Sequence, residues 1–253
     1  MRIFLKTEDE IILLRAASQL ATRALIEVGR HVVPRLALSH LRNKVVNAVM
    51  RTVPTESNSG KEALSSDTEF TFFVNGAYVE PSLEGECMLC EGDWLTVNCW
   101  VCLDGYYSFG AHTFIVGSSQ DDEPMTSTLI DMLRQVVRRA SAGHSIKEMS
   151  RTVYSLHSHD PYVLQKTFGH GVGRNRVENP ILRMNPGVND AVLLKEGMCL
   201  VIALAFKHGR SHLIKPRLMH ESTFHNPFVP FGTTVVLRPG RPEILTSFET
   251  IVK

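Results

Sequence analysis

The stretch that decides the fold is residues 91–114, which read EGDWLTVNCWVCLDGYYSFGAHTF. Apolar and polar residues alternate on both sides of Asp104-Gly105, a dipeptide that favours tight hairpin turns because both of its positions adopt positive φ. We therefore predict a long antiparallel hairpin within residues 93–116. Pairing across this turn places Asn98 and Phe109 on the same face of the hairpin, as diagonal neighbours.

The rest of the sequence predicts both helices and strands. Thr7 and Glu10 have the spacing of a capping box, and apolar residues then recur at helical spacing from Ile11 to Leu25, so a long helix begins here. Three further helices are predicted, over residues 39–50, 125–139 and 145–156. Four further strands are predicted, over residues 70–79, 162–168, 198–206 and 233–238. This order indicates an α+β fold.

Composition excludes several classes of function. The chain has 253 residues, of which 43% are hydrophobic, and its 27 Lys and Arg nearly balance its 26 Asp and Glu. Such a balance gives no reason to expect a DNA partner. No apolar run reaches the ~18 residues that a membrane helix needs, so no membrane partner is expected either. We expect a cytoplasmic protein, because five cysteines, an odd number, suit a reducing compartment.

Two CxxC pairs, Cys87/Cys90 and Cys99/Cys102, could in principle bind zinc. Cys99 and Cys102 lie in an apolar run that reads as a strand, where residues three apart face opposite sides. Buried thiols in the core are the better interpretation.

The hairpin, together with FGHGVGR at residues 168–174 and PEILT at residues 242–246, resembles the methionine aminopeptidases. The resemblance implies the pita-bread (creatinase/aminopeptidase-like) fold, in which two pseudo-symmetric halves carry curved antiparallel sheets covered by helices. The chain would be a single domain, with halves at about 1–120 and 121–253. A weak internal repeat agrees with this, since LCEGD at residues 89–93 resembles LKEGM at residues 194–198.

The same resemblance places the family's functional positions. Active members bind two divalent metals through two aspartates, one histidine and two glutamates, and these positions fall on Asn98, Phe109, His170, Ala203 and Gly232. Two further family histidines, which contact the substrate, fall on Glu80 and Val177. Of the metal-binding residues only His170 is retained, and a lone histidine is more often a hydrogen-bonded core residue than a ligand.

Because of these replacements, we interpret the chain as an inactive, metal-free pseudoenzyme. We expect no catalytic residue and no cofactor, and a peptide or protein partner in the former active-site cleft. The alternative is a working methionine aminopeptidase with a non-standard site, which would need two divalent metals (cobalt, manganese, zinc or iron).

One basic stretch could hold a second partner. Between Gly197 and His220 there is no acidic residue. The candidate contacts there are Lys207, Arg210, Lys215 and Arg217. A ribosome or RNA partner would suit this charge, although a solvated basic loop is the favoured interpretation.

Overall fold

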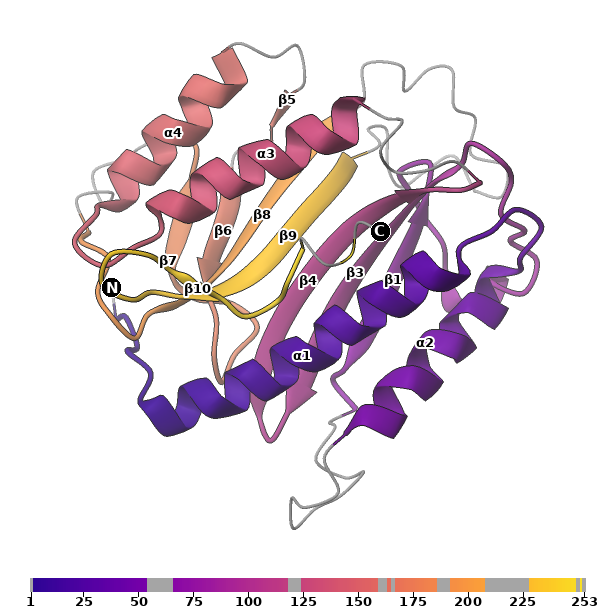
Figure 1. The fold of residues 1–253 in the computed structure, drawn as a ribbon, viewed down its shortest axis with the longest axis horizontal. Helices are drawn as coiled ribbons and strands as arrows, with labels where there is room; N and C mark the ends of the chain where they lie inside the picture. The colour runs from indigo at the N-terminus through magenta and orange to yellow at the C-terminus, as the bar shows by residue number, and fades with distance from the viewer. Residues whose placement is uncertain are drawn as a thin grey trace.

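The fold is built on one curved antiparallel sheet with helices on one of its faces (Figure 1). The computed structural model describes residues 2–53, 66–117, 124–158, 163–164, 167–185, 192–207, 228–248 and 251. The helices are α1 (Glu8–His31), α2 (Leu38–Thr52), α3 (Pro124–Arg139) and α4 (Ile146–Ser158), with a short 3-10 turn, η2, at Pro81–Leu83. No helix among the described residues combines the length and hydropathy that crossing a bilayer requires.

The sheet has ten strands. They are β1 (Glu69–Val74), β2 (Ala77–Tyr78), β3 (Trp94–Leu103), β4 (Tyr106–Ile115), β5 (Val163–Leu164), β6 (Thr167–Gly171), β7 (Glu178–Arg183), β8 (Cys199–Lys207), β9 (Phe228–Val236) and β10 (Glu243–Ile244). Their order is β2-β1-β3-β4-β9-β8-β6-β7, with β10 paired to β9 and β5 to β8. Strands from the beginning and the end of the chain therefore meet in the middle of the sheet, at β4 and β9.

The first helix begins as predicted. The Thr7 hydroxyl accepts a hydrogen bond from the Glu10 amide at 3.3 Å, and the Glu10 carboxylate accepts one from the Thr7 amide at 3.0 Å. Both bonds of the capping box are thus present. Beyond it, Ile11, Leu14 and Leu25 are fully buried, which confirms the apolar stripe.

The hairpin is also confirmed. Asp104 (φ 49°) and Gly105 (φ 76°) make the turn between β3 and β4. Asn98 pairs with Ala111, and Trp100 pairs with Phe109. Asn98 and Phe109 are therefore diagonal neighbours on one face, as the alternation predicts.

Three strand predictions need correction. The single strand expected over residues 70–79 is two strands, because Asn75 (φ 53°) and Gly76 (φ 79°) form a tight turn between β1 and β2. Strands β7 and β10 were not predicted. Strand β9 begins at Phe228, five residues earlier than expected, although it carries Pro230 and Gly232. Of the strand expected over residues 162–168, residues 162 and 165–166 lie outside the described residues.

Helices pack on the two ends of the sheet separately. One apolar cluster joins α1 and α2 to β1 and β3, and a second joins α3 and α4 to β6, β8 and β9. A smaller cluster between them combines Ile11 and Leu14 of α1 with residues of β4, β8 and β9. Figure 1 shows α1 and α2 over one half of the sheet and α3 and α4 over the other.

The seam between β4 and β9 uses side chains in place of a continuous backbone ladder. Ala111 and Gly232 form the one backbone pair described there. On one side of it, the Thr234 hydroxyl accepts from the Phe109 amide and donates to the Phe109 carbonyl, both at 2.9 Å. On the other side, the Thr113 hydroxyl donates to the carbonyl of Pro230 at 3.2 Å. Pro230 has no N–H and cannot donate to β4, so its contact with β4 is the bond that its carbonyl accepts from Thr113.

Candidate functional site

The five positions that the resemblance singles out lie together on one face of the sheet. They occupy consecutive strands: Asn98 on β3, Phe109 on β4, Gly232 on β9, Ala203 on β8 and His170 on β6. The pairs Ala111↔Gly232 and Ala203↔Gly232 connect them. The alternate residues of the same strands belong to the cores beneath the helices. We call the opposite side of the sheet, where the five positions lie, the site face.

Phe109 fills the middle of the site face. Its side chain is 7% exposed, and its ring centroid lies 4.8 Å from that of Trp100. A Cβ atom added to Gly232 would come within 2.7 Å of Phe109 Cε1 and 3.0 Å of Ala203 Cβ. Gly232 therefore has no room for a side chain while the Phe109 ring is in place.

His170 is held in a neutral form against the same aromatic group. Its ring lies parallel to that of Trp100, with centroids 6.1 Å apart. Nδ1 is 2.8 Å from the Gly171 carbonyl, which can only accept, so Nδ1 carries the hydrogen. Burial lowers the pKa of His170 below its ordinary value, and the hydrogen bond to Gly171 only partly offsets this. The other ring nitrogen, Nε2, is then left unprotonated.

The glycines on both sides of His170 bring other strands close. A side chain at Gly169 would collide with the Val201 carbonyl, and one at Gly171 would collide with the Asn179 carbonyl. The glycines thus fix β6 tightly between β7 and β8 and fix the direction of the imidazole.

Asn98 offers an unsatisfied acceptor. Its Oδ1 atom is buried, and no donor among the described residues bonds to it. Leaving such an oxygen unpaired costs about 1–3 kcal/mol. Its neighbour across the β1–β3 ladder is Thr71. A ligand that presents an N–H or O–H group here would remove this penalty.

Arg176 joins the two halves across the site face. Its guanidinium lies 5.7 Å from the ring centroids of both Trp100 and Tyr107, and it bonds the Glu69 carboxylate at 2.7 Å. This bond is the main reason that the pKa of Glu69 is lowered. The Tyr107 hydroxyl donates to Asp67 at 2.6 Å, which raises the pKa of Tyr107 to about 12. No local sequence pattern indicates these contacts, since their partners are far apart in the chain.

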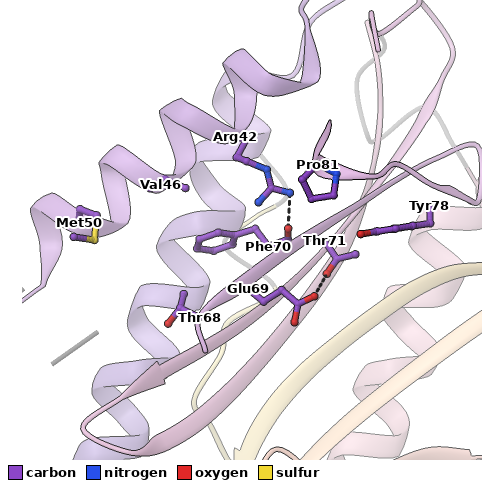
Figure 2. Close-up of a pocket in the computed structure, with 9 residues that line it drawn as sticks. All are labelled: Arg42, Val46, Met50, Thr68, Glu69, Phe70, Thr71, Tyr78 and Pro81. Carbon is purple, nitrogen blue, oxygen red and sulfur yellow. Dashed lines mark hydrogen bonds between the residues drawn. The ribbon is translucent and has the colours of Figure 1, made fainter. Parts of the chain in front are cut away.

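A pocket of about 370 Å³ opens beside this face, at the edge of the sheet (Figure 2). One wall is the edge strand β1, which contributes Phe70 and Thr71, and the opposite wall is helix α2, which contributes Arg42 and Val46. Since Thr71 pairs with Asn98, the pocket and the unsatisfied amide oxygen are on adjacent strands.

Comparison with known proteins identifies the family. The family model described as "Metallopeptidase family M24" matches residues 12–210, more than half of the chain. The chain belongs to metallopeptidase family M24. It is 28% identical over 225 residues to a methionine aminopeptidase of Helicobacter pylori, and the match covers 85% of this chain and 87% of that protein.

Solved structures confirm the fold of this M24 chain. A methionine aminopeptidase from Thermotoga maritima superposes with a TM-score of 0.77 at 21% identity, covering 97% of this chain and all of that one. The N-terminal domain of the FACT complex subunit SPT16 from chickpea superposes with a TM-score of 0.70 at 16% identity, covering 98% of this chain and 60% of that one. The predicted α+β pita-bread fold is therefore correct.

The remaining candidate residues of the M24 chain lie at the margins. Glu80 is exposed and precedes Pro81, which lines the pocket. Val177 is 58% exposed and follows Arg176. In the basic stretch, Lys207 is the last residue of β8, and Arg210, Lys215 and Arg217 lie outside the described residues.

The cysteines belong to the packing of this M24 domain. All five are free, and Cys87, Cys99, Cys102 and Cys199 are buried. Burial raises the pKa of Cys199 to about 12, so its thiol stays protonated. Among the described residues, no group of three or more His, Cys, Asp and Glu side chains is placed to hold a metal ion.

Proposed function

We propose that this M24 chain is a metal-free pseudoenzyme that binds a peptide or a protein segment on its site face. The observation that carries the proposal is the chemistry of the five clustered positions. They offer one imidazole nitrogen, one amide oxygen, a phenyl ring, a methyl group and a hydrogen atom. Hydrolysis by two metal ions needs several anionic or imidazole ligands to hold the ions and lower the pKa of a bound water.

The packing around Phe109 supports the same conclusion. A carboxylate at residue 232 would need the space that the Phe109 ring takes, as the hypothetical Cβ at Gly232 already does. The ring of Phe109 packs on Trp100, so it stabilises the fold by burying apolar surface. The donor set therefore does not fit a pair of divalent ions, and we derive no hydrolytic step from it.

The chemistry that remains on the site face suits binding. Trp100 is half-buried and presents an aromatic surface, Asn98 presents an unsatisfied acceptor, and His170 presents an unprotonated nitrogen. Aromatic surface combined with a few fixed polar groups is typical of binding sites. The similarity in fold to a domain of a FACT complex subunit supports a binding role by analogy alone. With five free cysteines, we place the protein in the cytoplasm.

Metal analysis tests the loss of catalysis. Protein purified in the presence of cobalt or manganese should hold well under one metal ion per chain. The His170→Ala variant should give the same value. If the protein instead binds about one metal ion per chain, and His170→Ala abolishes this binding, the result would favour the rival function, a methionine aminopeptidase with a non-standard site.

A peptidase assay provides a second criterion. Met-Ala-Ser peptides incubated with the protein and added metal ions should release no methionine above the buffer control. Release that saturates with peptide and disappears with a chelator would overturn the proposal. A known methionine aminopeptidase under the same conditions serves as the positive control.

Binding can be followed through Trp100. The chain has two tryptophans, so the Trp94→Phe variant leaves Trp100 as the fluorophore. Peptides that bind on the site face should change its emission, and His170→Ala should weaken the response. If a broad peptide set leaves the emission of Trp100 unchanged, the site face is not a peptide-binding surface.

A further inference from the structure

Among the residues that the structure describes, the outer edge of β1 has an open position in its hydrogen-bond ladder. Strand β2 pairs with β1 at Phe73 and Val74, and the Val79 amide then donates to the Phe72 carbonyl at 3.0 Å. Continued by two residues, this register would set Pro81 against Phe70. Proline has no N–H to donate, and here it starts the η2 turn, which leads the chain away.

Arg42 replaces the missing donor at this position. Its guanidinium donates to the Phe70 carbonyl at 2.7 Å, as Figure 2 shows. The Phe70 carbonyl therefore points outward, away from β3. Along a strand, the amide and the carbonyl of one residue point to the same side in antiparallel pairing, so the Phe70 N–H also faces outward.

The pocket of about 370 Å³ lies beside this open position. Its floor and walls combine apolar surface from Val46 and Met50 of α2 with Pro81, and Tyr78 lies at the far side (Figure 2). A volume of this size accommodates one or two apolar side chains of a ligand. An open backbone edge next to a side-chain pocket is the arrangement by which sheets accept an added peptide strand.

The charges around the pocket indicate what kind of peptide fits. Arg42 is paired with Glu84, whose side chain is 1% exposed, through a 2.6 Å bond from Nε. Glu69 is paired with Arg176 at 2.7 Å. Both charged residues of the pocket are thus neutralised by partners in the chain, so the described part of the chain offers a charged ligand no free counter-ion here. An uncharged segment is complementary to this surface.

We propose that the edge of β1 binds an uncharged, extended peptide segment of a partner protein, with a main-chain carbonyl that accepts from the Phe70 amide and an apolar side chain in the pocket between α2 and β1. This site lies at the edge of the sheet and does not require the site face to bind anything. It stands even if the chain proves to be an active peptidase.

Amide hydrogen exchange of the full-length chain, read by NMR, tests the proposal. The probes are acetylated and amidated pentapeptides, Thr-Thr-Xaa-Thr-Thr, in which Xaa is Ala, Val, Leu, Met or Phe. Binding should slow exchange of the Phe70 amide by the factor 1 + [L]/Kd, which is about tenfold when the peptide is at about nine times Kd. The larger apolar residues should bind more tightly than Ala. A trans-alkene in place of the central peptide carbonyl should abolish the effect, because it removes the acceptor for the Phe70 amide, whereas the Phe70 carbonyl is already bonded by Arg42.

Two variants separate the pocket from its surroundings. Met50→Glu places a charge in the pocket and should remove the slowing at Phe70. Asn47→Glu places the same charge on the exposed side of α2, outside the pocket, and should leave the slowing unchanged.

Three results would overturn the proposal. The first is that no peptide slows exchange at Phe70. The second is that the Phe70 amide is already strongly protected in the free chain, because the edge would then be closed by the chain itself. The third is that the peptides shift the side-chain amide resonances of Asn98 without affecting Phe70, which would place them on the site face and support the proposed function instead.

Discussion

The contact between Phe109 and Gly232 makes a quantitative prediction for a double-mutant cycle. In the otherwise native chain, Gly232→Ala adds a methyl group 2.7 Å from Phe109 Cε1 and 3.0 Å from Ala203 Cβ. Both distances are shorter than ordinary carbon contacts, and overpacking of this kind typically costs about 1–3 kcal/mol. The backbone itself does not resist alanine, since Gly232 does not have a positive φ.

The second arm of the cycle removes the phenyl ring. Phe109 is 7% exposed, and truncating a buried phenylalanine to alanine costs about 3–5 kcal/mol through lost burial and the cavity left behind. In the double variant, the new methyl group of residue 232 occupies part of that cavity. The combined loss should therefore be smaller than the sum of the single losses by about 1–3 kcal/mol.

Urea unfolding, followed by circular dichroism at one pH and one salt concentration, gives the four free energies of unfolding. The control cycle pairs Gly232→Ala with Phe72→Ala. Phe72 is also buried, at 0% exposed, but belongs to the core beneath α1 and α2, so its loss should simply add to that of Gly232→Ala. Additivity of the Phe109 and Gly232 changes to within about 0.5 kcal/mol would refute the idea that the ring excludes a side chain at residue 232.

Three further outcomes are expected. Phe109→Asp should lower the melting temperature in metal-free buffer, because it exchanges a buried ring for a carboxylate without a partner; an unchanged or higher value would contradict this. For His170, burial lowers the folded-state pKa, so the folded chain binds the proton more weakly than the unfolded chain. The free energy of unfolding should then rise as pH increases toward about 6.5 and level off above it, and His170→Gln should flatten this rise in urea titrations. Any partner captured at low salt through the basic stretch Lys207–Arg217 should be acidic or contain RNA, and it should dissociate as salt rises. Replacement of the four Lys and Arg residues of this stretch by Ser should abolish the capture. If the variant still captures the same partners, the stretch is not a binding site.

Local patterns predicted the elements that are defined by neighbouring residues. The capping box at Thr7 and the turn at Asp104-Gly105 depend on short-range geometry, so sequence was enough to place them. The diagonal relation of Asn98 and Phe109 then followed from the pleat alone. Asn75-Gly76 carried an equally strong turn signal, which the apolar character of the flanking residues concealed.

The missed features depend on contacts distant in sequence. Strand β7 pairs with β6, where Gly171 allows the close approach of Asn179. Strand β9 extends back through Pro230, a residue that argues against a strand, because β8 pairs with it as far as Lys207↔Phe228. The Arg42 and Arg176 contacts join segments that no local pattern relates.

The seam between β4 and β9 has a consequence for how the molecule comes apart. Most neighbouring strands are joined by many backbone pairs, whereas the described bonds between β4 and β9 are Ala111↔Gly232 and those of the Thr113 and Thr234 hydroxyls. Each half has its own helices and its own apolar cluster, and the Arg176–Glu69 pair and the smaller cluster around Ile11 and Leu14 also cross the junction. The two halves can thus behave as separate cooperative units, and the sheet should part along this line before either half loses its helices.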